Sequence, residues 1–112
     1  AAFPFGTSRE IEIGYAKVRA SRITYVGELG WELYIPAEFA GHVFETISTA
    51  GAEFNLTPAG MHTINNARTE KAYRHWGHDI SDEDTPLEAG LGFATAWDKP
   101  DFIGKAALEL FA

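Results

Sequence analysis

The chain has 112 residues, of which 46% are hydrophobic and 13% aromatic, enough for the core of one ordinary domain and too many for a disordered segment. Sixteen acidic residues against nine basic ones give a formal charge of −7, and such a surface repels phosphate backbones, so no nucleic-acid partner is expected. The absence of cysteine excludes disulfides and thiolate metal sites. With no signal peptide and no apolar run near the ~20 residues of a membrane helix, we expect a soluble, cytoplasmic protein.

The first part of the chain favours extended structure. Residues 10–26 are rich in Ile, Val, Tyr and Thr, and Gly14 is a candidate interruption. Residues 27–30 form a Gly-Glu-Leu-Gly turn signal, because glycine reaches backbone angles closed to other residues. Apolar and polar residues then alternate over residues 31–35, as in a half-buried strand. The pattern predicts a hairpin of two strands joined by a four-residue turn.

Two helices are predicted next. Apolar residues at helical spacing indicate a helix over residues 37–50, with Gly51 as its stop. A second helix is predicted to begin with Thr57 as N-cap and Pro58 at the first helical position, and to end near residue 73 or 74.

The last third is predicted to contain an acidic loop at residues 81–84, a strand over residues 91–97 and a helix over residues 104–111. Strands followed by helices and a further strand argue for an α+β fold.

Two kinds of cofactor motif were considered. Neither G-x-G-x-x-G nor a Walker loop is present, so flavin or nucleotide binding is not encoded in these residues. His75, His78 and Asp79 offer nitrogen and oxygen ligands, but the histidines are not at the i, i+4 spacing of a helical metal motif. We therefore predict no metal site.

Glu28 is the carboxylate with the most functional interest. A glutamate between two turn glycines is presented rigidly and could accept paired N–H donors from a flat heterocycle. The alternative is an ordinary solvated turn residue, which is the commoner case. Arg68 lies near the apolar side of the second predicted helix, where it either joins a salt-bridged face or is buried with a partner. Residue patterns alone name no substrate.

Three segments resemble a known family. Residues 25–32, Tyr-Val-Gly-Glu-Leu-Gly-Trp-Glu, resemble the Y-x-G-E-x-G-x-E signature of the glycine cleavage T-protein (aminomethyltransferase) family. Residues 68–80, Arg-Thr-Glu-Lys-Ala-Tyr-Arg-His-Trp-Gly-His-Asp-Ile, are similar to the corresponding stretch of its dimethylglycine and sarcosine dehydrogenase branch. Residues 85–93 and 102–108 resemble the segments that follow in both.

The resemblance implies that tetrahydrofolate is the ligand. It implies that Glu28 holds the pterin ring through paired hydrogen bonds, with Tyr25, Gly27 and Phe93 as further folate-binding residues. Arg68 and Trp31 are implied as structural residues that support the pocket. The family passes a one-carbon unit to tetrahydrofolate, giving 5,10-methylenetetrahydrofolate. In the dehydrogenase branch a separate N-terminal domain with FAD first oxidises an N-methyl group.

The resemblance also implies an architecture. We expect residues 1–112 to be a single fragment of the folate-binding domain, with ferredoxin-like α+β lobes, and the C-terminal barrel segment to start at about residues 98–112. The parent enzyme would be an oxidoreductase, in the mitochondrial matrix if eukaryotic. The fragment alone would be inactive, because the catalytic aspartate of the family lies upstream and no residue here inherits that role. Ile64 stands where T-proteins carry an arginine for the folate tail.

Two alternatives remain open from the sequence. One is a stand-alone aminomethyltransferase or folate-dependent demethylase. The other is a non-catalytic folate-binding module.

Overall fold

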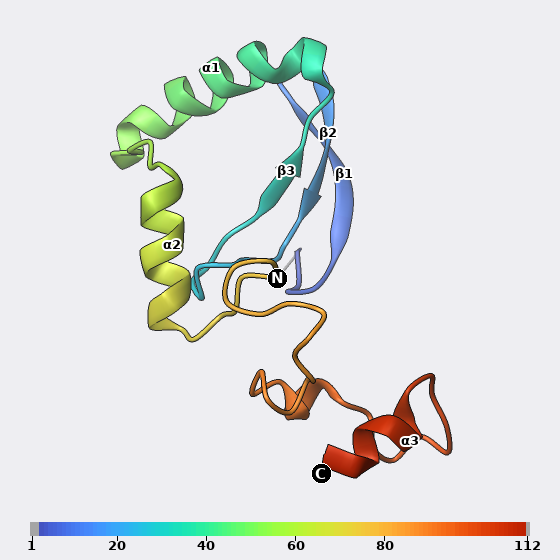
Figure 1. The fold of residues 1–112 in the computed structure, drawn as a ribbon. Helices are drawn as coiled ribbons and strands as arrows, with labels where there is room; N and C mark the ends of the chain where they lie inside the picture. The colour runs from blue at the N-terminus through green and yellow to red at the C-terminus, as the bar shows by residue number, and fades with distance from the viewer. Residues whose placement is uncertain (1–2, 112) are drawn as a thin grey trace. The chain divides into compact units, whose positions relative to one another are not determined.

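The computed structural model describes residues 3–111 (Figure 1). The chain divides after Tyr73 into two compact units. The first unit begins with a three-stranded antiparallel sheet of β1 (Ser8–Ile13), β2 (Ala16–Ser21) and β3 (Glu32–Tyr34), in the order β1-β2-β3. The mixed α+β class predicted from the sequence is thereby confirmed, and three antiparallel strands with packed helices are consistent with part of the expected lobe.

Gly14 does interrupt the stretch of residues 10–26 that was predicted to be extended, and β1 and β2 lie on either side of it. Gly14, with φ of 60°, turns the chain tightly between β1 and β2, so that Ile11 faces Val18 across the pair. The predicted pairing with the next strand is confirmed, because Ala20 of β2 faces Leu33 of β3. The connection is not a four-residue turn, however, since β2 already ends at Ser21 and leaves a loop of residues 22–31.

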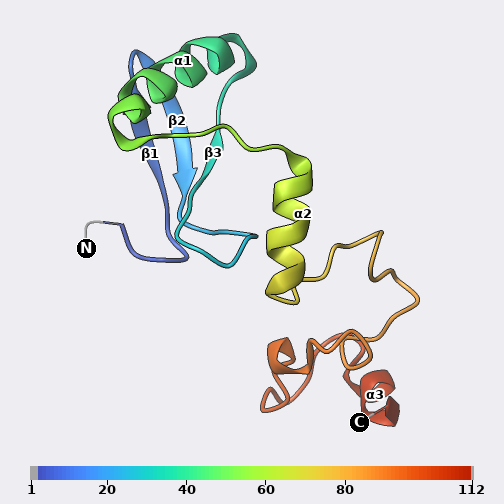
Figure 2. The same cartoon turned by 90° about the vertical axis from the view of Figure 1, so that its left-hand side faces the viewer.

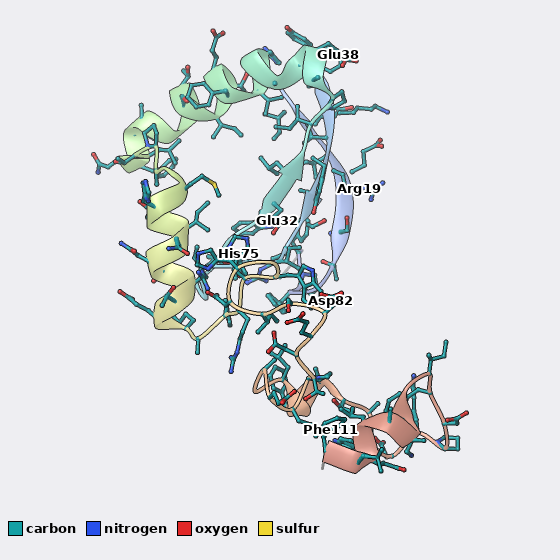
Figure 3. The ribbon with its side chains drawn as sticks, in the orientation of Figure 1. Arg19, Glu32, Glu38, His75, Asp82 and Phe111 are labelled. Carbon is teal, nitrogen blue, oxygen red and sulfur yellow. The ribbon has the colours of Figure 1, made fainter. Side chains whose placement is uncertain are left out.

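Alternation of side chains on β2 creates the core of this unit. Ala16, Val18 and Ala20 are buried, and the residues between them are exposed. Helix α1 (Ala40–Gly51) lies across the sheet (Figure 2). Its Val43 is fully buried and packs into the same core as Ala16 and Val18. On neighbouring strands, Arg19 and Glu32 are exposed and polar (Figure 3). Burial of small and branched side chains between sheet and helix is the apolar contact that holds the unit together.

The helix predicted over residues 37–50 is confirmed, and α1 ends at Gly51 as predicted, but the chain does not leave the helical path there. Turns of 3₁₀ helix precede and follow α1, at Ala37–Phe39 and Ala52–Phe54, and the left-handed residue that ends the run is Asn55, with φ of 56°. Gly51 keeps helical angles and serves packing instead. A Cβ there would lie 2.6 Å from Cβ of Leu56, whose amide donates a hydrogen bond to the Gly51 carbonyl.

Helix α2 (Met61–Glu70) begins later than predicted. Its N-cap is Gly60 in extended conformation, and no side chain caps it. The hydroxyl of Thr57 donates to the carbonyl of Asn55 and is not engaged at the helix start. The prediction of Thr57 and Pro58 as cap and first position was therefore wrong. The helix also ends earlier than predicted, at Glu70.

The second unit contains turns and short helices. Residues 91–97, predicted as a strand, contain the 3₁₀ turn Gly92–Ala94, and the amides of Ala94 and Thr95 donate to carbonyls three residues back. Local turns therefore satisfy backbone groups that a strand would need a neighbour to satisfy. The C-terminal helix is confirmed as α3 (Lys105–Leu108) followed by a 3₁₀ turn at Glu109–Phe111. Across the described part of the chain, no helix combines the length and apolar character needed to cross a membrane.

Candidate functional site

The loop of residues 22–31 carries the predicted site, and both of its ends are fixed. Arg22 donates its amide to the carbonyl of Thr7 at 2.9 Å, which extends the pairing beyond β2. At the other end, the Trp31 ring packs edge-on against Phe3 with centroids 6.2 Å apart, and the Arg22 guanidinium lies 5.7 Å above the Trp31 ring. Trp31 therefore anchors the loop where it enters β3, and its support of a folate pocket stays a prediction.

Gly27 adopts a left-handed conformation that brings the chain against α2. Its φ is 72°, and a Cβ placed on it would lie 2.3 Å from Cγ of Lys71. The methylene chain of Lys71, at the C-cap of α2, thus covers the Gly27 backbone. Any larger residue at position 27 would meet both backbone strain and this side chain.

Tyr25 contacts the same end of α2 through an aromatic pair. Its ring stacks on that of Tyr73 with centroids 6.0 Å apart and an interplanar angle of 20°. Both residues remain partly exposed, at 37% for Tyr25 and 40% for Tyr73.

Arg68 is a buried polar residue with clear partners. It is only 5% exposed, and its Nε donates to Oδ1 of Asn65 at 2.9 Å while its Nη1 donates to the carbonyl of Tyr73 at 3.0 Å. The sequence left open whether this arginine is surface-paired or buried, and the structure shows burial with partners. The guanidinium supports the C-terminal end of α2.

Glu28 itself is exposed and uncommitted. Within residues 3–111, its carboxylate takes part in no hydrogen bond or ion pair. Glu32, the second glutamate of the same motif, differs: its Oε2 accepts a 2.8 Å hydrogen bond from the Tyr34 hydroxyl, and this bond, with the nearby negative charge, raises the pKa of Tyr34. Of these two carboxylates, Glu28 is therefore the one available to a ligand.

Phe93 belongs to the second unit and lies in the 3₁₀ turn Gly92–Ala94. Its side chain is 86% exposed, so packing within that unit does not explain why a large aromatic residue stands there. That Phe93 lines one pocket with Glu28 stays a prediction.

The histidine pair has a structural explanation. Oδ2 of Asp79 accepts the amide of His75, Oδ1 of Asp79 pairs with Nδ1 of His78, and the two imidazole rings stack with centroids 5.6 Å apart. These contacts close the loop after residue 74. Within the described residues, no group of three or more His, Cys, Asp or Glu side chains is arranged to hold a metal ion.

Two contact residues were missed by the sequence reasoning, namely Lys71 and Tyr73. The sequence placed both inside a continuing helix, where they would point in different directions. A helix stop at Glu70 followed by the left-handed Ala72 brings both to the Glu28 loop. Unlike glycine, alanine gives no signal of such a stop in the sequence.

An apolar groove lies elsewhere in the first unit. It has a volume of about 360 Å³ and is bounded by α1 and residues 56–58, with Ile35, Phe44 and Ile47 in its wall. None of the predicted folate-binding residues lines it.

An exposed carboxylate on the same loop as a partly exposed aromatic ring is suited to a planar ligand with N–H donors. The sequence model described as "GCVT N-terminal domain" matches residues 1–99, and the chain belongs to that family. Its relatives include human mitochondrial sarcosine dehydrogenase, 44% identical over 96% of this chain, and mouse mitochondrial dimethylglycine dehydrogenase, 43% identical over 96%. An aminomethyltransferase from Halothermothrix orenii is 45% identical over 83% of this chain. The chain spans 12% of the length of the two dehydrogenases and 26% of that of the aminomethyltransferase.

Proposed function

We propose that this chain is the tetrahydrofolate-binding part of an FAD-dependent N-methylglycine dehydrogenase of the dimethylglycine or sarcosine type. The observation that supports this most is the exposed, unpaired carboxylate of Glu28, held on a turn beside the Tyr25 ring in a chain of the GCVT family. The mitochondrial dehydrogenases named above favour the dehydrogenase branch, and for a eukaryotic parent they favour the mitochondrial matrix.

The residues fit a reduced folate. One edge of the pterin ring carries adjacent N–H donors, which a carboxylate can accept as two charge-assisted hydrogen bonds. The neighbouring aromatic ring of Tyr25 offers a flat surface for stacking, and Phe93 would add a second one. Gly27 allows the chain to turn so that Glu28 projects outward.

The role of this chain in the reaction is to hold the acceptor. FAD in a separate domain would oxidise the N-methyl group, and the folate would take up the carbon as 5,10-methylenetetrahydrofolate. No residue of this chain is assigned to catalysis, and no G-x-G-x-x-G stands here for a flavin. Its partners would be the flavin domain and the C-terminal barrel of the parent protein.

A tetrahydrofolate titration of the full-length protein tests the proposal, with Glu28→Gln compared with wild type. The variant should bind about tenfold or more weakly, since losing a charge-assisted hydrogen bond costs about 1.5–3 kcal/mol. Glu38→Gln is the matched control, because Glu38 is also exposed and lies on the turn before α1 (Figure 3). Equal tetrahydrofolate affinity in wild type and Glu28→Gln would show that the folate binds at a site that does not include Glu28. No binding by wild type would reject the proposal.

A stand-alone aminomethyltransferase is the second candidate, favoured by the 45% identity to the H. orenii protein. A full-length protein that binds no flavin and transfers carbon from an aminomethyl-lipoyl carrier would establish it.

A third candidate is a module without folate chemistry. It is favoured by a 44% identical relative named 4-methylaminobutanoate oxidase (formaldehyde-forming), from Paenarthrobacter nicotinovorans. Trapping of formaldehyde at the same yield with and without tetrahydrofolate would indicate it.

A further inference from the structure

We propose that the C-terminal end of α2 is a positioning device for the Glu28 turn, with Lys71 and Tyr73 as its contact residues and Arg68 as the residue that fixes them. This inference rests on the proposed function, because the turn matters through the ligand that Glu28 would hold. All the contacts that make up this device lie within the first unit.

The turn does not hold its own shape. Of the hydrogen bonds within the described residues, a single one involves residues 26–30, from the Val26 amide to Oγ1 of Thr24 at 3.2 Å. A segment with two glycines and so few hydrogen bonds samples many conformations unless neighbouring groups restrict it. Glu28, at its centre, would then lose the fixed direction that paired hydrogen bonds require.

Two side chains from the end of α2 supply the restriction. The methylenes of Lys71 lie against the Gly27 backbone, one residue before Glu28. Two residues further back, the Tyr25 ring stacks on Tyr73. The contacts come from both sides of Ala72, so the loop is held at two points by a short piece of chain.

Residues 72 and 73 are held in place by hydrogen bonds to the last turn of α2. Ala72, with φ of 56°, donates to the carbonyl of Thr69, and Tyr73 donates to the carbonyl of Arg68, the hydrogen-bond pattern of a Schellman stop. The Arg68 guanidinium then donates to the Tyr73 carbonyl at 3.0 Å. Arg68 therefore binds both polar backbone groups of Tyr73. Its carbonyl accepts from the Tyr73 amide, and its guanidinium donates to the Tyr73 carbonyl.

Asn65 completes the arrangement. Its Oδ1 accepts from both Nε and Nη2 of Arg68, so the planar guanidinium is held on the helix it stabilises. Buried polar groups with satisfied hydrogen bonds specify one geometry, because any other arrangement leaves a buried donor unpaired. The chain of contacts runs from Asn65 through Arg68 and Tyr73 to Tyr25 and so to the Glu28 turn.

A fixed Glu28 turn favours one class of ligand. A planar heterocycle with two adjacent N–H donors needs both carboxylate oxygens at hydrogen-bond distance at once, and a shift of about 1 Å breaks at least one bond. Lys71 and Tyr73 would thus set the affinity for such a ligand without touching it.

The experiment compares paired variants of the full-length protein. Tyr73→Ala removes the ring, whereas Tyr73→Phe keeps it. Lys71→Gly removes the methylenes, whereas Lys71→Met keeps an unbranched apolar chain and loses only the ammonium. Two rates are compared for each variant: cleavage after Glu28 by a glutamyl endopeptidase, and cleavage after the exposed Glu53, which lies beyond α1 and serves as an internal control. Tetrahydrofolate affinity is measured on the same samples.

We expect cleavage after Glu28 to rise about fivefold to tenfold in Tyr73→Ala and Lys71→Gly, with cleavage after Glu53 unchanged, because one aromatic or apolar contact is lost from the closed turn. Folate affinity should fall in parallel, and Tyr73→Phe and Lys71→Met should restore both. Unchanged cleavage after Glu28 in the first two variants would overturn the device. Faster cleavage with unaltered folate affinity would overturn its role in positioning. Wild type could bind no folate while cleavage after Glu28 still rises in Tyr73→Ala and Lys71→Gly. The proposed function would then be wrong, and so would the role of the device in ligand binding. The structural support of the turn by Lys71 and Tyr73 would remain valid.

Discussion

The amide of Tyr15, in the β1–β2 turn, donates a hydrogen bond to Nε2 of His42 on α1 at 3.2 Å, and the two aromatic rings stack with centroids only 3.6 Å apart. The turn and the helix are 27 residues apart in the sequence. His42 thus joins α1 to the hairpin outside the apolar core.

Replacing Gly14 should disturb this junction. Gly14 has φ of 60°, and a Cβ on it would lie 2.1 Å from Nε2 of His42. Gly14→Ala should lower the free energy of unfolding by about 2–4 kcal/mol, of which about 1–2 kcal/mol comes from the left-handed backbone and the rest from displacing the imidazole. Chemical denaturation measures the change.

A second variant separates the two causes. In a His42→Ala background the steric conflict is gone, so Gly14→Ala should cost only the backbone part, about 1–2 kcal/mol. Gly41→Ala is the control, because no atom lies within 4 Å of its Cβ position in α1, and it should stabilise by about 0.5–1 kcal/mol. An equal cost of Gly14→Ala in both backgrounds would contradict the steric explanation.

Ala72 offers a stabilising substitution. It is the left-handed residue of the Schellman stop after α2, a position that favours glycine. Ala72→Gly should raise the free energy of unfolding by about 0.5–1 kcal/mol, because relief of about 1–2 kcal/mol of strain exceeds the entropy cost of glycine. Ala67→Gly, inside the same helix, should instead destabilise by about 1 kcal/mol or more. If Ala72→Gly destabilised the chain as well, the stop would not be under strain.

The spacing of apolar residues correctly predicted the helices and strands that pack one apolar face against the rest of the first unit. The helix of residues 37–50 was found because its apolar spacing matches the contact that Val43 makes with the sheet. The pairing of β2 with β3 was found for the same reason. In both cases the residues that determine the structure lie within the element itself.

Boundaries set by contacts between distant residues could not be predicted. Gly51 has the residue type of a helix stop, but Leu56 packs on it and the chain turns at Asn55. The alternation over residues 91–97 suggested a strand, although no strand among residues 3–111 pairs with it and local turns form instead. A strand needs a partner, which one-dimensional periodicity does not supply.

The loop that carries the candidate site could be identified from its motif, and the folate-binding role of its residues stays a prediction. Glu28, Gly27 and Tyr25 do lie together on one loop, as the motif indicated, whereas their supports Lys71 and Tyr73 depended on the stop at Ala72. Resemblance of residues, more than their periodicity, carried the folate assignment.

Phe93 provides a test of the proposed pocket that is separate from stability. Because its side chain is 86% exposed, Phe93→Ala should change the free energy of unfolding by no more than about 0.5 kcal/mol. If the ring stacks on the pterin, tetrahydrofolate affinity of the full-length protein should drop by about 0.5–1.5 kcal/mol, a factor of about 2–13. Phe54→Ala is the matched control, since Phe54 is also largely exposed and lies after α1. Equal affinity in the two variants would remove Phe93 from the site.

The last prediction concerns pH and the turn that precedes Phe93. Oε2 of Glu88 accepts hydrogen bonds from the amide of Thr85 at 3.0 Å and from its hydroxyl at 2.8 Å, while the Glu88 amide donates to Oγ1 of Thr85 at 3.2 Å. This reciprocal pair is a capping box. The hydrogen bonds from Thr85, the backbone one first, hold the pKa of Glu88 below its ordinary 4.5.

Acid should weaken the turn that Glu88 stabilises, because the pKa of Glu88 is lowered by folding. Because the pKa is lower in the folded state, the ionised carboxylate stabilises the turn at all pH values above 4.5, and this stabilisation is lost as the pH falls through the lower, folded-state pKa. The amide proton of Thr85 should titrate with a midpoint below 4.5 in an NMR experiment, because its hydrogen bond weakens when Glu88 is protonated. Thr85→Val removes the hydroxyl but keeps the amide, so the midpoint should move part of the way back up. In Glu88→Gln the titration of this amide should vanish, and a midpoint at or above 4.5 in the unaltered chain would show that the carboxylate does not cap this turn in solution.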